Sequence, residues 1–105
     1  MAENNTVLTE GVYLILLSLT SPLHGYGIIK SVSEKTDGRV NLAAGTLYGA
    51  INNLLSRGWI SELEAEEGSR KKEYVITAEG KIALEKEYSR LRQLVELGRD
   101  ALEEK

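Results

Sequence analysis

The segment from Gly11 to Leu19 reads GVYLILLSL, and a helix with this sequence is apolar on almost every side. Thr9 precedes it and suits an N-cap, because its hydroxyl can accept a hydrogen bond from an otherwise unpaired backbone N–H. A helix without a polar face needs apolar neighbours all round. One domain of 105 residues can cover one side of this helix well, so we expect a second subunit to cover part of the rest. The alternative is a central helix that is buried within its own domain.

The composition predicts one folded domain and excludes several functional classes. The chain is 42% hydrophobic and 28% charged, which is typical of a globular protein, and it contains no cysteine for a thiolate zinc site, a disulfide or a nucleophile. The single histidine, His24, is expected to have a turn or capping role beside Gly25. Without a spaced carboxylate pair there is no acid–base set, so we expect no enzyme activity, no cofactor and no metal site.

Neither a basic secretory start nor an apolar run of about 20 residues is present, so the sequence predicts a cytoplasmic protein without membrane contact. The net charge is −3 and the isoelectric point is near 5.2. A surface that binds anions must therefore be local to one part of the molecule.

Turn residues divide the following segment into two further helices. Pro22 and Gly25 interrupt the chain after the first helix, and an Asp-Gly pair at residues 37–38 ends the next. A second helix is predicted from about Tyr26 to Lys35. The third helix ends at Gly58, which suits the left-handed position that follows many helices.

The third helix has two glycines, although an interior glycine costs a helix about 1 kcal/mol relative to alanine. At 100° per residue, the leucines and the isoleucine share a sector of about 100° and form a core stripe. A small, uncharged face with Asn, Ser and Thr suits the DNA major groove, about 12 Å wide, where Asn can pair with adenine. A solvated face with incidental glycines is the alternative. The polar face consists of Gly45, Gly49, Asn52 and Ser56, flanked by Thr46 and Asn53.

Alternating residues after Gly58 predict a β-hairpin. The first strand runs from about Ile60 to Glu66, and the return strand, KKEYVI, places Tyr74 and Ile76 on one face. Cations where the turn meets the second strand can contact phosphates while a neighbouring helix contacts bases. The alternative is that they pair with the glutamates of the hairpin. The residues concerned are Ser69, Arg70, Lys71 and Lys72.

Thr77 is expected to cap a last helix that carries a long apolar seam. Such a seam at the end of a small chain favours association with a second copy, and packing back on the first helix is the alternative. We therefore predict a mainly α fold with a small β-hairpin, namely a winged helix-turn-helix (1–77) followed by a dimerisation helix (78–105). The predicted dimer contacts are Val12, Leu16, Leu84, Tyr88, Leu91, Val95 and Leu102.

The motifs HGYGIIK, GTLYGAINNLLSRGWI and SRKKEYVITAEGK, with their spacing, resemble the PadR family of bacterial transcriptional regulators over about Leu8 to Leu97. The closest resemblance is to the short members, in which one C-terminal helix forms the dimer. It implies a homodimeric repressor that binds a palindromic operator in double-stranded DNA. By position, Tyr26, Gly45, Thr46 and Tyr48 correspond to DNA-facing or motif positions, and residues 69–72 to the wing tip.

Two positions depart from the family pattern. The Ser-Pro pair that commonly precedes the recognition helix is Ala43-Ala44 here, and a long polar residue after the motif tyrosine is replaced by Gly49. We therefore expect DNA affinity to depend on the wing. Some members bind planar aromatic or phenolic ligands between the dimerisation helices, where Tyr88 and Tyr13 would supply the rings. The alternative function is a winged helix that binds only other proteins.

Overall fold

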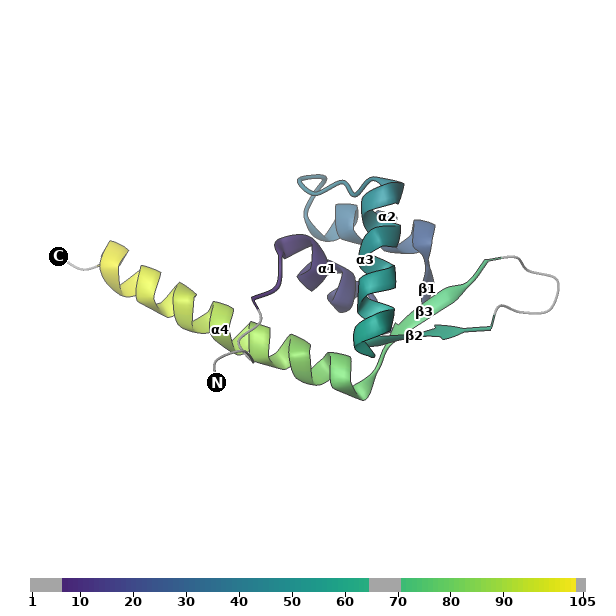
Figure 1. Ribbon diagram of the computed structural model, residues 1–105. Coiled ribbons are helices and arrows are strands. Elements are labelled where there is room, and N and C mark those ends of the chain that lie inside the picture. The colour runs from purple at the N-terminus through teal and green to yellow at the C-terminus, as the bar shows by residue number, and fades with distance from the viewer. Residues whose placement is uncertain (1–6, 65–70, 104–105) are drawn as a thin grey trace.

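The computed structural model describes residues 7–64 and 71–103 and is mostly helical, with a small three-stranded antiparallel sheet (Figure 1). The predicted order of three helices, a hairpin and one long helix is confirmed, with one short strand added. In chain order the elements are α1 (Glu10–Ser18), β1 (Leu23–His24), α2 (Gly25–Lys35), α3 (Ala44–Arg57), β2 (Ile60–Leu63), β3 (Glu73–Ile76) and α4 (Ala78–Glu103).

The added strand is β1, which pairs with β3 through Leu23↔Tyr74 and His24↔Glu73. The sheet order is β1-β3-β2, so β3 is the central strand and not the free edge of a hairpin. A strand of two residues has no alternation that a sequence pattern can show, and its pairing depends on tertiary contact. The prediction of a two-stranded hairpin was therefore incomplete.

Helix α1 lies in the middle of the core, where Ile15, Leu16 and Leu19 have at most 1% of their surface exposed. The core consists of buried apolar residues from α1, α2, α3, β2 and β3. This burial corrects the prediction that Leu16 contacts a partner: it has no exposed surface within one chain and packs in its own core. Cover for the apolar helix is thus supplied mainly by its own domain.

Helices α1 and α2 begin, and α3 ends, at predicted caps. The Thr9 hydroxyl accepts a hydrogen bond from the Val12 N–H at 3.1 Å, and the His24 Nδ1 accepts one from the Gly27 N–H, also at 3.1 Å. Helix α3 ends at Gly58, whose φ of 77° is in the left-handed region that favours glycine.

Thr77 holds the end of α3, the sheet and the start of α4 together. Its hydroxyl donates to the Gly58 carbonyl at 2.7 Å and accepts from the Gly80 N–H at 3.0 Å. Its backbone N–H donates to the Trp59 carbonyl at 2.9 Å. Gly80 packs so closely that a Cβ there would overlap the Trp59 carbonyl oxygen. The first turn of α4 is therefore fixed against backbone atoms.

Helix α4 packs on α1 through its first half, and its C-terminal half projects beyond the body of the molecule (Figure 1). Leu84 packs against the core, and Glu87 is buried beside it. The Glu87 carboxylate accepts hydrogen bonds from the Leu8 N–H at 3.2 Å and from Arg90 at 2.6 Å and 2.8 Å. The Arg90 bond lowers the pKa of Glu87 below its ordinary value, while burial opposes the shift.

Candidate nucleic-acid interface

The outward face of α3 is small and polar, as the spacing of its residues predicts. Leu47, Ile51 and Leu54 are buried in the core, and the opposite side faces solvent. A Cβ built on Gly45 or Gly49 would meet no atom within 4 Å, so neither glycine is required by packing within the chain. The exposed residues on this face are Gly45, Thr46, Gly49, Asn52, Asn53 and Ser56.

Helix α3 also begins without a side-chain cap. Ala43 occupies the N-cap position, and no described side chain accepts a hydrogen bond from the first turn. The first backbone N–H groups of a helix have no partner within the helix and carry the positive end of its dipole. They are therefore available to solvent or to an anion that approaches this end of α3.

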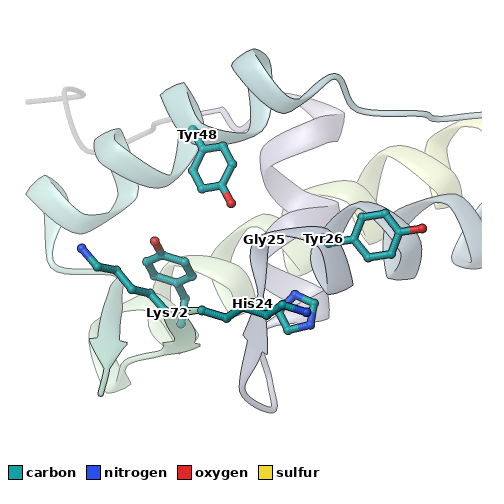
Figure 2. A pocket seen from close by; sticks show the side chains of 7 residues that line it. His24, Gly25, Tyr26, Tyr48 and Lys72 are labelled. Atoms are coloured by element: carbon teal, nitrogen blue, oxygen red, sulfur yellow. The ribbon is translucent and has the colours of Figure 1, made fainter. Parts of the chain in front are cut away.

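The side chain of Tyr48 extends from α3 towards the start of α2, and Tyr48 is 46% exposed. Its hydroxyl lies over Gly25 at the start of α2, where a Cβ would overlap the phenol (Figure 2). The Tyr48 ring can therefore occupy this position because Gly25 has no side chain. Tyr26, the next residue of α2, is 70% exposed.

Beside Tyr48 lies a hollow of about 460 Å³, which we call the wing hollow (Figure 2). It brings together the start of α2, the middle of α3 and the approach to β3, which are distant in sequence. It is lined by His24, Gly25 and Tyr26 on the α2 side, by Tyr48 from α3, and by Lys71, Lys72 and Tyr74 from the wing, which is the hairpin that contains β2 and β3.

Most residues expected to bind DNA therefore lie on two adjoining surfaces, the α3 face and the wing hollow. Lys71 and Lys72 are exposed beside the hollow, and Lys72 pairs with Glu62 at 3.5 Å. The expected pairing of hairpin cations with glutamates is thus present for this lysine. Ser69 and Arg70 lie outside the described residues.

Besides Gly25, two residues of the hollow, His24 and Tyr74, were not predicted from the sequence as possible ligand contacts. His24 was expected to cap a helix, and it does, through Nδ1. Tyr74 was expected to share one face of its strand with Ile76, and it is 6% exposed. Burial and the nearby Glu62 charge raise the pKa of Tyr74, so its phenol stays protonated. Only their positions beside Tyr48 show that both also reach the hollow.

The second exposed feature is an apolar face along α4. It includes four of the expected dimer contacts: Tyr88 is 55% exposed, Val95 66% and Leu102 86%, and Leu91 is partly exposed. Val12 on α1 is partly buried and packs against the core, as Leu84 does. Further apolar residues on the exposed surface of α4 are Ile82, Leu94 and Leu97.

A family model for the transcriptional regulator PadR-like family matches residues 14–86, which include the second half of α1, all of α2 and α3, the strands of the wing and the start of α4. The chain belongs to the PadR-like family. Among curated proteins, none gives a significant match. Within the described residues of this PadR-like chain, no helix has the length and apolar character needed to cross a membrane.

Solved structures agree with the family assignment. A PadR family transcriptional regulator from Eggerthella lenta DSM 2243 is 28% identical, with a TM-score of 0.76 over 90% of this chain and 82% of the other. A PadR family transcription regulator from Clostridium difficile R20291 is 26% identical, with a TM-score of 0.76 over 90% and 99%. The repressor MarR is 16% identical with a TM-score of 0.72, which shows the shared fold alone.

Proposed function

We propose that this PadR-like regulator represses transcription as a homodimer that places α3 in the DNA major groove. The observation that carries the proposal is the outward face of α3, where Gly45 and Gly49 have no atom near a potential Cβ. A partner that needs close approach gives a function to two glycines on an exposed helix face. Asn52 on this face has an amide that can pair with adenine.

The wing would supply the contacts that position α3. Lys71 and Lys72 lie at the end of β3 nearest the turn, on the same side of the molecule as Tyr48. Lysines at this place can meet backbone phosphates whatever the base sequence. An uncapped first turn in α3 adds backbone N–H groups that can bind a phosphate in the same way.

The apolar face of α4 supports the dimer. At about 25 cal/mol per Å² of apolar surface removed from water, covering a seam of several large side chains is strongly favourable. A two-fold axis through this seam would separate the two α3 helices by about one DNA turn, which fits a palindromic operator. A small aromatic effector bound in this interface would find Tyr88 and Tyr13 as its ring contacts.

The test is salt-dependent binding to duplex DNA from upstream of the protein's own gene. A plot of log K against log salt has a negative slope, and the magnitude of this slope should decrease by about 0.9 for each phosphate that is no longer neutralised. Lys72→Ala with Lys71→Ala should therefore flatten the slope by nearly two units and weaken binding to all duplexes similarly. Lys35→Ala, at the opposite end of α2, is the matched control and should leave the slope unchanged.

A winged helix that binds only proteins would give a different result. In that case the wild-type chain shows no salt-dependent retention of any duplex, specific or not. An unchanged slope after substitution of both wing lysines would remove the wing from the mechanism while leaving α3 in it.

A further inference from the structure

The wing hollow has a local charge opposite to that of the chain. The protein carries 16 acidic residues against 13 lysines and arginines, yet none of the described residues that line the hollow is acidic. Two of them are lysines, and the start of α2 adds the positive end of a helix dipole. Lys72 itself pairs with Glu62 at 3.5 Å.

The Glu62–Lys72 pair does not neutralise the hollow. Both side chains are well exposed, at 43% and 65%, and an exposed pair at this distance contributes little. The Lys72 ammonium can therefore turn towards an anion in the hollow at small cost.

Tyr74 gives the hollow a hydrogen-bond donor that has no partner among the described residues. The residue is 6% exposed, and among the described residues its hydroxyl makes no hydrogen bond. No fully buried side-chain nitrogen or oxygen of the described residues lacks a partner, so this hydroxyl must reach the open space of the hollow. Such a donor in a buried side chain is stabilised by an acceptor that enters from solvent.

His24 supplies a second donor of fixed orientation. Its Nδ1 accepts the Gly27 N–H at 3.1 Å, so in the neutral ring the proton is on Nε2. The capping bond also holds the ring at the start of α2, where it borders the hollow (Figure 2).

The remaining wall is aromatic. Tyr26, Tyr48 and Tyr74 present rings from three different elements around a volume of about 460 Å³. This volume is within the range of small-molecule sites and fits a ligand with one planar ring. Rings, cations and hydroxyl donors together recognise a flat molecule that carries a negative group.

We propose that the wing hollow binds a small aromatic anion, a carboxylate or phosphate on one planar ring, and that this ligand excludes DNA from the wing. The site is distinct from the α4 interface, at which an effector of the dimer would bind. Ligand binding itself needs no DNA, whereas exclusion of DNA rests on the proposed function.

The first experiment titrates phenyl phosphate into the full chain without DNA and follows binding by calorimetry. Phenyl phosphate should bind about tenfold more tightly than inorganic phosphate or phenol, because each of these has only half of the contacts. Tyr74→Phe and Lys72→Met should each weaken binding by about fivefold or more, since each removes one donor and leaves the packing in place. Lys35→Met removes the same ammonium group at the far end of α2 and should change nothing.

Gly25→Ala tests the shape of the site without changing its charge. The added Cβ would displace the Tyr48 hydroxyl, which can swing into solvent, so the chain should stay folded and lose phenyl phosphate binding. Binding that is equal for phenyl phosphate and inorganic phosphate, or unaffected by Tyr74→Phe, Lys72→Met and Gly25→Ala, would overturn the site.

The second experiment adds phenyl phosphate to the complex with upstream DNA. The apparent Kd for DNA should rise in proportion to ligand concentration, and this rise should be absent in Tyr74→Phe at ligand levels that only the wild type binds. If the apparent Kd for DNA does not change when phenyl phosphate is bound, the ligand does not exclude DNA. A chain that binds phenyl phosphate but no duplex would refute the proposed function and leave the site standing.

Discussion

Helices α3 and α4 both expose one long face, and the two faces are opposite in character. The α3 face is built from glycine, threonine and asparagine, with no large apolar side chain except Tyr48 at its edge. The α4 face carries leucine, valine and tyrosine, and Val95 and Leu102 are 66% and 86% exposed. Within one chain, both faces are exposed to solvent and do not pack in the core.

The difference indicates two kinds of partner. An apolar face gains free energy from any contact that removes it from water, so a second copy of the same seam is sufficient. A face of short polar side chains gains little from apolar contact and is useful only against a surface rich in hydrogen-bonding groups. In the function we propose, the α3 face therefore meets a DNA groove, and the α4 face meets another α4.

The largest expected effect comes from a charge in the apolar seam. Leu91→Glu should place an unpaired carboxylate in the α4 contact and dissociate the dimer. Because a dimer engages two half-sites at once, DNA affinity should then fall by about 10²- to 10⁴-fold. Sedimentation at micromolar concentration and DNA retention measure the two effects.

Lys86→Glu introduces the same side chain on the other side of α4 and should leave the dimer intact. If the wild-type chain sediments as a stable monomer and still binds DNA tightly, the α4 face has no role as a dimer seam, and the comparison with α3 loses half its basis.

Gly49→Leu should have a small effect on the stability of the chain but a large effect on DNA binding. Nothing lies within 4 Å of the new Cβ, and leucine favours a helix over glycine by up to about 1 kcal/mol, so stability should be equal or higher. A long side chain on this face should nevertheless hold α3 away from the groove. Thermal unfolding and DNA binding should thus change in opposite directions.

Gly80→Ala is the contrasting substitution. Its Cβ would overlap the backbone carbonyl of Trp59, which cannot swing aside, so unfolding free energy should fall by about 1–3 kcal/mol. If Gly49→Leu were destabilising and Gly80→Ala harmless, our assignment of the free and the packed glycine would be reversed.

The smallest expected effect concerns the buried side of α4. Glu87→Gln keeps the size of the side chain but removes the charge that Arg90 and the Leu8 N–H stabilise, and should cost about 1–3 kcal/mol at neutral pH. The folded pKa of Glu87 is lowered, so its contribution is present above the unfolded value of about 4.3 and lost as pH falls through the folded pKa.

Denaturant unfolding between pH 7 and pH 3 measures this dependence. The difference between wild type and Glu87→Gln should shrink below about pH 4.3. Glu96→Gln removes a similar i,i+3 partner, that of Arg99, at the exposed end of α4. It should alter stability little at any pH, and an equal effect of both substitutions would refute a special role for the buried carboxylate.

The helices were predictable because their ends carry local signals. Thr9, Gly58 and Thr77 act on backbone groups within a few residues, so their roles follow from sequence alone. The two faces of α3 were predictable for a similar reason, because the helix period fixes which residues share a side. The short strand β1 was not, since its pairing with β3 is made across about 50 residues of chain.

The wing hollow could not be derived in the same way. His24, Tyr48 and Tyr74 come from three elements, and each also has an ordinary role as cap, helix residue or strand core. The importance of Gly25 depends on where the Tyr48 ring lies, which no local pattern specifies. Leu16 was misplaced because an apolar helix gives no sign of whether its cover is internal or comes from a partner.

The Thr77 junction has a mechanical consequence. With its hydroxyl bonded to Gly58 and to Gly80, α3, the wing and the first turn of α4 must move as one rigid arm. Helix α4 has 26 residues and is therefore about 39 Å long. If two copies cross along their α4 seams, a change of about 5° in the crossing angle changes the distance between the two α3 helices by up to about 3 Å. The crossing angle would then determine which spacing of operator half-sites the dimer can bind. Small substitutions in the seam would change this preferred spacing without any change in α3.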